Sequence, residues 1–263
     1  MTTPRPRPTA KHRIDGLQVE VHGSIEAVGA AAAVDMAEEM KRAIAARARA
    51  RVILASANSQ LTFLRALRTA PGIAWDKVDV FHMDEYVGLE PDHPASFQRF
   101  LRRELIDHVP GVTFHPIPGD PGRVSETSAA YESLLRETEV DAVAMGYGEN
   151  GHIAFNDPPF ADFADPVWVK AVKLDEVSRR QQVGEGHFAS IGDVPTHAIS
   201  LTIPALLSPR RIFCIVPEAR KADAVHDCLR LPVSEDRPGS VLRTVTHARL
   251  YLDEESATRL RSE

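Results

Sequence analysis

Residues 140–158 read VDAVAMGYGENGHIAFNDP and join an apolar run to a glycine-rich polar loop. The apolar part, 140–145, is typical of a buried strand. In open parallel sheets, functional groups collect on the loops that leave the carboxyl ends of the strands. Glycines at positions 146, 148 and 151 allow sharp turns and let the backbone approach a ligand closely. The stretch therefore predicts a buried strand followed by a functional loop.

The same succession of strand, polar turn and helix recurs along the chain, with strands expected at 51–55, 78–83 and 211–216 and helices at 25–50 and 61–69. Strands that alternate with helices predict parallel pairing with right-handed crossovers. The expected fold class is α/β, a Rossmann-like, doubly wound three-layer sandwich around a mainly parallel sheet. No G-x-G-x-x-G motif follows the first strand, so dinucleotide binding is not indicated.

Length and composition indicate one domain. A chain of 263 residues with 43% hydrophobic content can bury a single core, which we expect over residues 16–263. Residues 1–15 begin with a Pro-rich segment and are expected to form a disordered N-terminal arm. Residues 160–192 mix proline, aspartate, glycine and charged residues, and are the expected lid region.

Charge and cysteine content limit the classes of binding partner and the cellular compartments that are expected. A net charge of −6 and a pI near 6.0 argue against a nucleic-acid or membrane-surface partner. No apolar run reaches the roughly 18 to 20 residues of a membrane-spanning helix. Two cysteines suggest neither a disulfide scaffold nor a metal cluster, so a cytoplasmic location is expected. The histidine spacing fits no metal triad, and neither a metal nor another cofactor is expected.

A second informative stretch, residues 78–89, reads VDVFHMDEYVGL. It places two adjacent acids, Asp84 and Glu85, where an apolar strand is expected to end. Together with GENGHIAFNDP at 148–158, it resembles the signatures of the glucosamine-6-phosphate deaminase (isomerase) family, whose superfamily also contains 6-phosphogluconolactonases. Weaker resemblance runs from about residue 20 to residue 255.

The resemblance implies an enzyme that converts a phosphorylated hexose or hexosamine to a ketohexose phosphate. Asp84 matches the catalytic base, which would take the C2 proton and return it to C1, and Glu85 would tune or orient it. His152 matches the histidine that relays the ring-opening proton. Asp157, five residues later, is the carboxylate placed to orient the imidazole.

Two positions depart from the family pattern. The family usually has Asp where this chain has Asn150, and Glu where it has Asp157. An amide cannot ionise, so a role that needs negative charge at position 150, such as binding a substrate ammonium, is weakened. The sequence therefore leaves open whether ammonia is released, and whether the sugar is gluco or galacto.

The phosphate of such a substrate would bind at turns that follow two of the strands. The turn Ser56, Ala57, Asn58 and Ser59 precedes an expected helix, whose N-terminus attracts anions. Lys221 follows the strand 211–216 and matches the phosphate-binding lysine of the family. A family arginine from the lid clamps the phosphate, and Arg179 or Arg180 is the candidate here.

Two other functions remain open from the sequence. A phosphosugar lactonase would use His152 as the base for water and would need no acid at Asp84, but lactonases follow their histidine with Thr-Ala-Ser rather than Ile-Ala-Phe-Asn. A non-catalytic sugar-phosphate sensor is the other alternative. The chain also leaves a homo-oligomer open.

Overall fold

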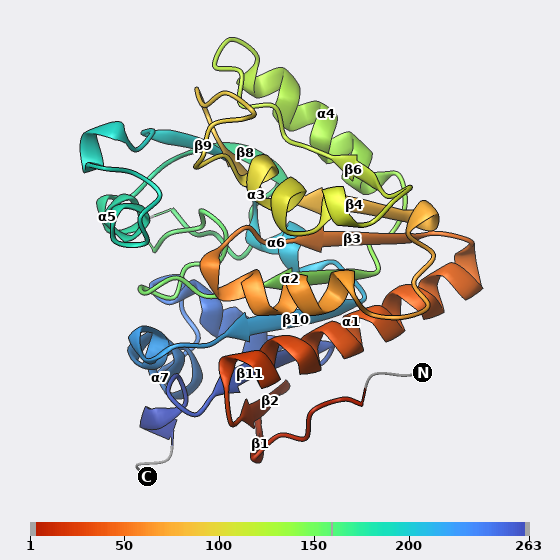
Figure 1. The fold of residues 1–263 in the computed structure, drawn as a ribbon. Helices are drawn as coiled ribbons and strands as arrows, with labels where there is room; N and C mark the ends of the chain where they lie inside the picture. Colours follow the sequence, from red (N-terminus) through yellow and green to blue (C-terminus); the bar gives the residue numbers. More distant parts are fainter. Residues whose placement is uncertain (1–3, 159, 261–263) are drawn as a thin grey trace.

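Four apolar runs of the sequence form neighbouring parallel strands in the computed structural model, which describes residues 4–158 and 160–260. They lie at the centre of an eight-stranded sheet with the order β1-β2-β11-β10-β7-β3-β4-β6 (Figure 1). All pairs are parallel except β1 with β2. In that order the strands span Ala10–Ile14, Leu17–His22, Ala248–Asp253, Arg211–Val216, Ala142–Met145, Ala50–Leu54, Val78–His82 and Thr113–His115.

Helices cover both faces of this sheet, because alternate residues of each strand point to opposite sides. Ile53 of β3 packs in one core with helices α4, α6 and α7, whereas Val52 and Leu54 pack in the other with α1, α2 and α3. The α-helices are α1 Ile25–Arg47, α2 Leu61–Arg68, α3 Phe97–Glu104, α4 Val124–Arg136, α5 Glu176–Gly184, α6 Ile203–Leu207 and α7 Ala222–Arg230. The predicted doubly wound α/β fold with a mostly parallel central sheet is confirmed.

Short 3₁₀ helices complete the connections between these elements. They are η1 Asn58–Gln60, η2 Trp75–Lys77, η3 Ile106–His108, η4 Ile191–Asp193, η5 Ala219–Lys221, η6 Pro238–Thr244 and η7 Thr258–Leu260. The predicted helix 25–50 ends earlier, at Arg47, because Ala48 adopts a left-handed conformation with φ = 66° and turns the chain into β3.

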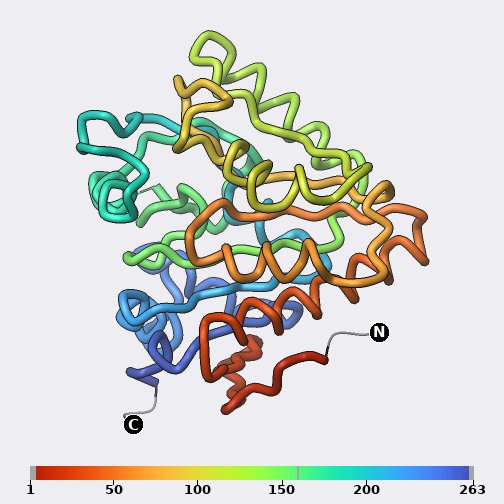
Figure 2. The backbone as a smooth tube through the Cα atoms, viewed as in Figure 1, coloured from red at the N-terminus to blue at the C-terminus, as the bar shows by residue number. Residues whose placement is uncertain are grey.

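A second, three-stranded sheet lies outside the main one and was not predicted. Its order is β5-β9-β8, and the strands, Asp84–Tyr86, His197–Leu201 and Val169–Lys173, pair antiparallel. Asp84 and Glu85, expected in a loop, therefore lie in β5. The expected lid region 160–192 contains β8 and α5. Figure 2 shows this segment in green to teal, beyond the ends of the main-sheet strands.

The prediction of a disordered arm at residues 1–15 is wrong for the described part of that segment; residues 1–3 lie outside it. Residues 10–14 form β1, which pairs with β2 along its whole length. Before it, the guanidinium of Arg5 bonds to Asp35 at 2.7 Å and to Glu20 at 2.6 Å. These two distant carboxylates fix a segment whose Pro-rich composition alone suggests no partner.

Strand order determines where a ligand site can form. From β3 the chain adds β4 on one side, whereas β7, β10 and β11 follow on the other side. The side on which successive strands are added thus reverses between β3 and β7, and a crevice opens outside the carboxyl ends of strands at such a switch point. The loops that follow β3, β4, β7 and β10 carry all the sequence motifs described above.

One strand-end histidine has a structural role. His82, the last residue of β4, is fully buried, and its Nε2 accepts the Ile117 N–H at 2.7 Å. Burial lowers the pKa of His82 to about 3. The unfolded chain, with a pKa near 6.5, therefore binds a proton that the folded chain does not. Stability is lost as the pH falls from about 6.5 towards 3.

Replacing His82 by glutamine tests this linkage. A glutamine amide oxygen can accept the Ile117 N–H but cannot titrate. We expect the free energy of unfolding of His82→Gln to decrease less than that of the wild type between about pH 6.5 and 4.5. Urea titrations across this range measure it; parallel pH curves for the two proteins would assign the acid sensitivity to other groups.

Candidate active site

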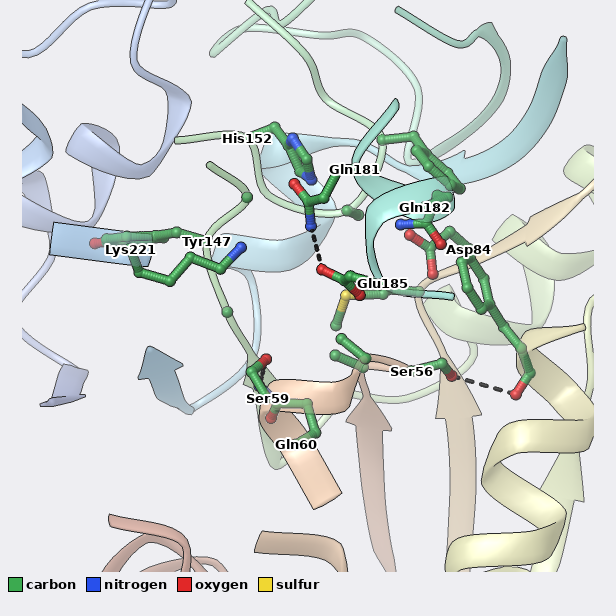
Figure 3. A pocket seen from close by; sticks show the side chains of 18 of the residues that line it. Ser56, Ser59, Gln60, Asp84, Tyr147, His152, Gln181, Gln182, Glu185 and Lys221 are labelled. Atoms are coloured by element: carbon green, nitrogen blue, oxygen red, sulfur yellow. Dashed lines mark hydrogen bonds between the residues drawn. The ribbon is translucent and has the colours of Figure 1, made fainter. Parts of the chain in front are cut away.

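The ends of β10, β7, β3 and β4 surround one cleft, and α5 covers it (Figure 3). Figure 1 shows α5 beyond the tips of these strands. The cleft is lined by Ala55, Ser56, Ala57, Ser59, Gln60, Met83, Asp84, Phe97, Gly146, Tyr147, Gly148, His152, Ala154, Phe155, Gln181, Gln182, Glu185, Arg220 and Lys221. Residues from six separate segments of the sequence therefore meet at the switch point.

Asp84 is the acid that faces the cleft. Its residue is only 7% exposed, and its carboxylate accepts no hydrogen bond from any residue in the described part of the chain. Burial raises the pKa of Asp84 well above its usual range, and the charge of Glu85 raises it further. A desolvated carboxylate without donors is a stronger base than an exposed one, and this environment suits proton abstraction.

Glu85 points away from the cleft, although it is adjacent in sequence. Its two oxygens accept hydrogen bonds from the N–H groups of Tyr86, Phe97 and Gln98 and from the Ser96 hydroxyl, at 2.9–3.1 Å. It thereby satisfies the free N–H groups at the start of α3. Burial nevertheless raises the pKa of Glu85. Glu85 thus holds α3 against β5 and acts on Asp84 only through its charge.

The imidazole of His152 is fixed on one side. Its Nδ1 lies 2.7 Å from Asn150 Oδ1 and 3.2 Å from Asp157 Oδ1. Amide and carboxylate oxygens only accept, so Nδ1 of a neutral ring carries the hydrogen. Nε2 then has the lone pair and is the nitrogen left for the cleft. This tautomer is the one that a proton relay to a sugar oxygen needs.

Asn150 and Asp157 stand behind His152 and do not line the cleft. The Asn150 amide bridges the pair, since its Oδ1 accepts from His152 and its Nδ2 donates to Asp157 Oδ1 at 3.2 Å. Burial alone would raise the pKa of Asp157, but the hydrogen bonds and charge of His152, with the donors Ser178 and Asn150, lower it. Asp157 is therefore held as an anion. The substitution at position 150 falls within the relay and not in a position to bind a substrate ammonium.

Two glycines make this arrangement sterically feasible. A Cβ on Gly148 would lie 2.0 Å from Cε1 of His152, so any side chain there would displace the ring. Gly151 adopts φ = 80°, a conformation that other residues rarely adopt. The loop predicted from its glycines thus folds back on itself, with Gly148 N–H bonded to the His152 carbonyl at 2.8 Å.

A cationic corner lies across the cleft from Asp84. Lys221, in η5, is only 3% exposed, and its ammonium has no hydrogen-bond or ion-pair partner among residues 4–158 and 160–260. Burial and then the charge of Arg220 lower the pKa of Lys221. A buried ammonium is costly without an anion. The corner is therefore arranged for an anionic ligand.

The turn after β3 lines the cleft on the same side as Lys221. Ser56, Ala57 and Ser59 face the cleft, but Asn58 does not. Gln60, which was not predicted, also faces the cleft. Its Nε2 donates to the Ile215 carbonyl of β10 at 3.2 Å. This bond holds the turn against the neighbouring strand end.

The prediction that Arg179 or Arg180 faces the phosphate site is not met by the structure. Arg179 donates to the carbonyls of Ile191 and Val194, and so supports η4. Arg180 lies on the exposed side of α5 and pairs with Glu176. Instead, Arg220 lines the cleft, one residue before Lys221.

Helix α5 closes the cleft with polar side chains. Gln181, Gln182 and Glu185 line it, and Glu185 pairs with Arg220 at 2.8 Å. Burial would raise the pKa of Glu185, but donors from His187, Arg220 and Gln181 lower it to about 2, so it is ionised. The remaining cavity is about 70 Å³, well below the roughly 300–1,000 Å³ of ligand sites. A ligand of that size can therefore enter only if α5 or the side chains that line the cleft shift outward.

Comparison with known proteins decides the family. The model of the family described as glucosamine-6-phosphate isomerases/6-phosphogluconolactonase matches residues 23–251. The chain belongs to this family. A glucosamine-6-phosphate deaminase from Exiguobacterium sibiricum is 35% identical over 195 residues, which cover 72% of this chain and 75% of that protein. Another, from Pseudarthrobacter chlorophenolicus, is 32% identical over 250 residues, 93% of each chain.

Solved structures of the glucosamine-6-phosphate isomerase/6-phosphogluconolactonase family agree. A monomeric glucosamine-6-phosphate deaminase superposes with a TM-score of 0.83 at 26% identity, covering 91% of this chain and 98% of that one. A 6-phosphogluconolactonase from Shewanella baltica gives a TM-score of 0.74 at 18% identity, covering 92% and 98%, a likeness that concerns the fold. The family resemblance expected from the two motifs is confirmed.

The described part of the chain holds neither a cluster of metal ligands nor a membrane-spanning helix. Residues 4–158 and 160–260 contain no group of three or more His, Cys, Asp or Glu side chains arranged to hold a metal ion. No helix in this part of the chain is long and apolar enough to cross a membrane.

Proposed function

We propose that this protein converts glucosamine 6-phosphate, or a closely related hexosamine 6-phosphate, and water to the ketohexose 6-phosphate and ammonia. The observation that carries the proposal is the pairing of an unbonded buried carboxylate, Asp84, with the free Nε2 of His152 in one cleft. Aldose–ketose conversion needs these two proton-transfer groups. The deaminase relatives support the amino sugar as the substrate.

The family resemblance suggests the roles of these residues, and the geometry of the cleft supports them. His152 relays the proton that opens the pyranose ring, with Asn150 and Asp157 holding its tautomer. Asp84 then takes the C2 proton and returns it to C1, which moves the double bond from C1 to C2. Water replaces nitrogen at C2, and ammonia leaves. Lys221 and Arg220, with the turn Ser56, Ala57 and Ser59, would bind the phosphate.

Product analysis tests the proposal. Purified protein is incubated with glucosamine 6-phosphate, and fructose 6-phosphate and ammonia are both measured; we expect equal amounts. Glucose 6-phosphate and 6-phosphogluconolactone serve as parallel substrates. Ketose from glucose 6-phosphate without ammonia from the amino sugar would indicate a pure isomerase. Turnover of the lactone alone would indicate a lactonase, and binding without any turnover would indicate a sensor.

The proposal also covers the surroundings of the enzyme. Cys214 and Cys228 are both buried free thiols, which supports a reducing, cytoplasmic location. Whether the protein forms a homo-oligomer is a separate question that size measurement in solution answers.

Glu185 gives a prediction about substrate affinity. Its carboxylate forms an ion pair with Arg220 in the closed cleft. A phosphate that binds Arg220 must displace this carboxylate, so Glu185 competes with the substrate for Arg220. We expect Glu185→Gln to lower KM several-fold and to lower the inhibition constant of inorganic phosphate in parallel. Steady-state kinetics with phosphate as the competitor measures both.

Glu218→Gln is the matched control, because Glu218 also pairs with Arg220 but does not line the cleft. Its KM should stay near that of the wild type. A raised KM in Glu185→Gln, seen with glucosamine 6-phosphate but not with fructose 6-phosphate in the reverse reaction, would contradict the prediction and would place Glu185 next to the substrate amine.

A further inference from the structure

A serine of the lid helix reaches the histidine relay. Ser178, in the first turn of α5, is only 1% exposed. Its hydroxyl donates to Asp157 Oδ1 and lies 3.1 Å from Nδ1 of His152. Neither motif of the sequence includes it. It is the member of the relay that does not come from the loop after β7.

This contact differs from the usual behaviour of a helical serine. A serine inside a helix commonly bonds to a carbonyl of its own preceding turn, as Ser128 of α4 does with Val124. Ser178 instead points its hydroxyl at a carboxylate on another segment. Since a carboxylate only accepts, the hydroxyl must be the donor, and its own lone pairs then face the N–H at Nδ1 of His152.

The hydrogen bonds at Asp157 show what the serine does. Oδ1 receives the contacts from Ser178, Asn150 and His152, whereas Oδ2 is buried without any partner among the described residues. The carboxylate is therefore held by one oxygen only. Without the Ser178 hydroxyl, one charge-assisted hydrogen bond to Asp157 is lost. The carboxylate can then rotate more easily, so that Oδ2 replaces Oδ1 next to His152.

We propose that Ser178 is a positioning residue that completes the His152 relay only when α5 lies over the cleft. The proposal rests on the function proposed above and extends it, because it makes lid closure a condition for ring opening and not only a barrier to water. With α5 displaced for substrate entry, Asp157 loses this donor. With α5 closed, the carboxylate and the imidazole regain one fixed orientation.

Kinetics of three variants test the proposal. Ser178→Ala should lower kcat by about 10- to 100-fold, as expected when a reacting group is misplaced, and should leave KM within about two-fold. Ser178→Thr keeps the hydroxyl and should recover most of the activity. Ser128→Ala removes a buried helical hydroxyl far from the cleft, and its kcat should match the wild type. Equal kcat for Ser178→Ala and the wild type would overturn the proposal.

The tautomer of the His152 ring gives a readout that a structural role alone would not move. Without the Ser178 hydroxyl, the Asp157 carboxylate no longer has one fixed orientation towards Nδ1, so part of the Ser178→Ala protein should carry the ring hydrogen at Nε2. NMR of protein with ¹⁵N-labelled histidine measures it, and the signal missing from His152→Gln assigns the ring. Asp84, Glu185, Arg220 and Lys221 also face this cleft and are unchanged in the variant.

The two assays separate failure of this proposal from failure of the proposed function. If the wild type turns over no sugar phosphate, the proposed function is wrong, and the NMR measurement of the His152 tautomer still decides whether Ser178 acts on His152. If the wild type is active but Ser178→Ala shows only a lower Tm, with kcat and the His152 tautomer unchanged, Ser178 merely packs α5 and the proposal is wrong.

Discussion

Asp84→Asn should lower kcat by about 10²- to 10⁴-fold, the usual contribution of a positioned base. Phosphate contacts remain, so KM should change little. In the wild type Asp84 must be ionised to accept the C2 proton, and burial has raised its pKa. Activity should therefore fall on the acid side at a pH above the ordinary carboxyl range. Steady-state kinetics over pH 5–9 measures both effects.

The same substitution should stabilise the folded protein. A carboxyl whose pKa is raised on folding favours the folded state at low pH and disfavours it above that pKa, where the buried anion is costly. Asp84→Asn removes this cost, so its Tm near pH 8 should exceed that of the wild type. Glu85→Gln is the contrasting control, since Glu85 accepts one hydrogen bond from the Tyr86 N–H and three from Ser96, Phe97 and Gln98 at the start of α3, and its loss should lower Tm. Retention of more than about a tenth of the activity in Asp84→Asn would exclude it as the base.

Lys221→Met should raise KM for glucosamine 6-phosphate by about 10- to 150-fold, corresponding to a charge-assisted contact of about 1.5–3 kcal/mol. The contact is made to substrate and transition state alike, so kcat should change less. Methionine fills a similar volume without charge, and the buried unpaired ammonium disappears. We therefore expect a higher Tm in phosphate-free buffer. Kinetics and thermal melts of the same preparation provide both numbers.

Arg220→Met helps to interpret that result. Arg220 lines the same corner but is already paired with Glu185 and Glu218, so its loss should raise KM less than the loss of Lys221. An unchanged KM in Lys221→Met would place the phosphate elsewhere. A lower Tm in Lys221→Met would show that the ammonium has a partner in the folded protein.

Three residues that the sequence predicted for the site line one cleft and share one property. Asp84, His152 and Lys221 each follow an apolar run, and parallel strands bring their carboxyl ends to one edge of the sheet. Their proximity therefore follows from the strand pattern and the strand order. The three-residue strand β5 is too short to leave such a pattern, so the second sheet could not be foreseen.

Two residues that were predicted for the phosphate site but do not line the cleft, Arg179 and Arg180, differ from the lining residues of α5 in their position around the helix axis. Residues 178, 181, 182 and 185 have the i, i+3, i+4, i+7 spacing of one helical face, and that face meets the relay and the cleft. Arg179 and Arg180 lie off this face. These two arginines were predicted from their charge. The helical phase, which places them on the other side of α5, was not taken into account. The same spacing would have pointed to Ser178 and Glu185.

Arg220 was missed for a different reason. It adjoins Lys221, but a charged residue at a helix start is usually solvated, and its sequence shows no partner. The partners come from Glu149, Glu185 and Glu218, and only the first and last lie near strand ends that the sequence identified. The pair with Glu185 depends on the position of α5, which the sequence around Arg220 does not reveal.

The contact between Gly148 and the His152 ring also bears on how the substrate range of this enzyme could be changed in the laboratory. A library that varies position 148 would yield almost only dead clones, since every other side chain would displace the ring. Diversity is better placed at Gln182, which reaches the same cleft from α5, whereas Gln181 accepts the Glu149 N–H of the relay loop at 3.2 Å. Directed evolution should therefore proceed through the helix that covers the sugar, with the loop beneath it kept intact.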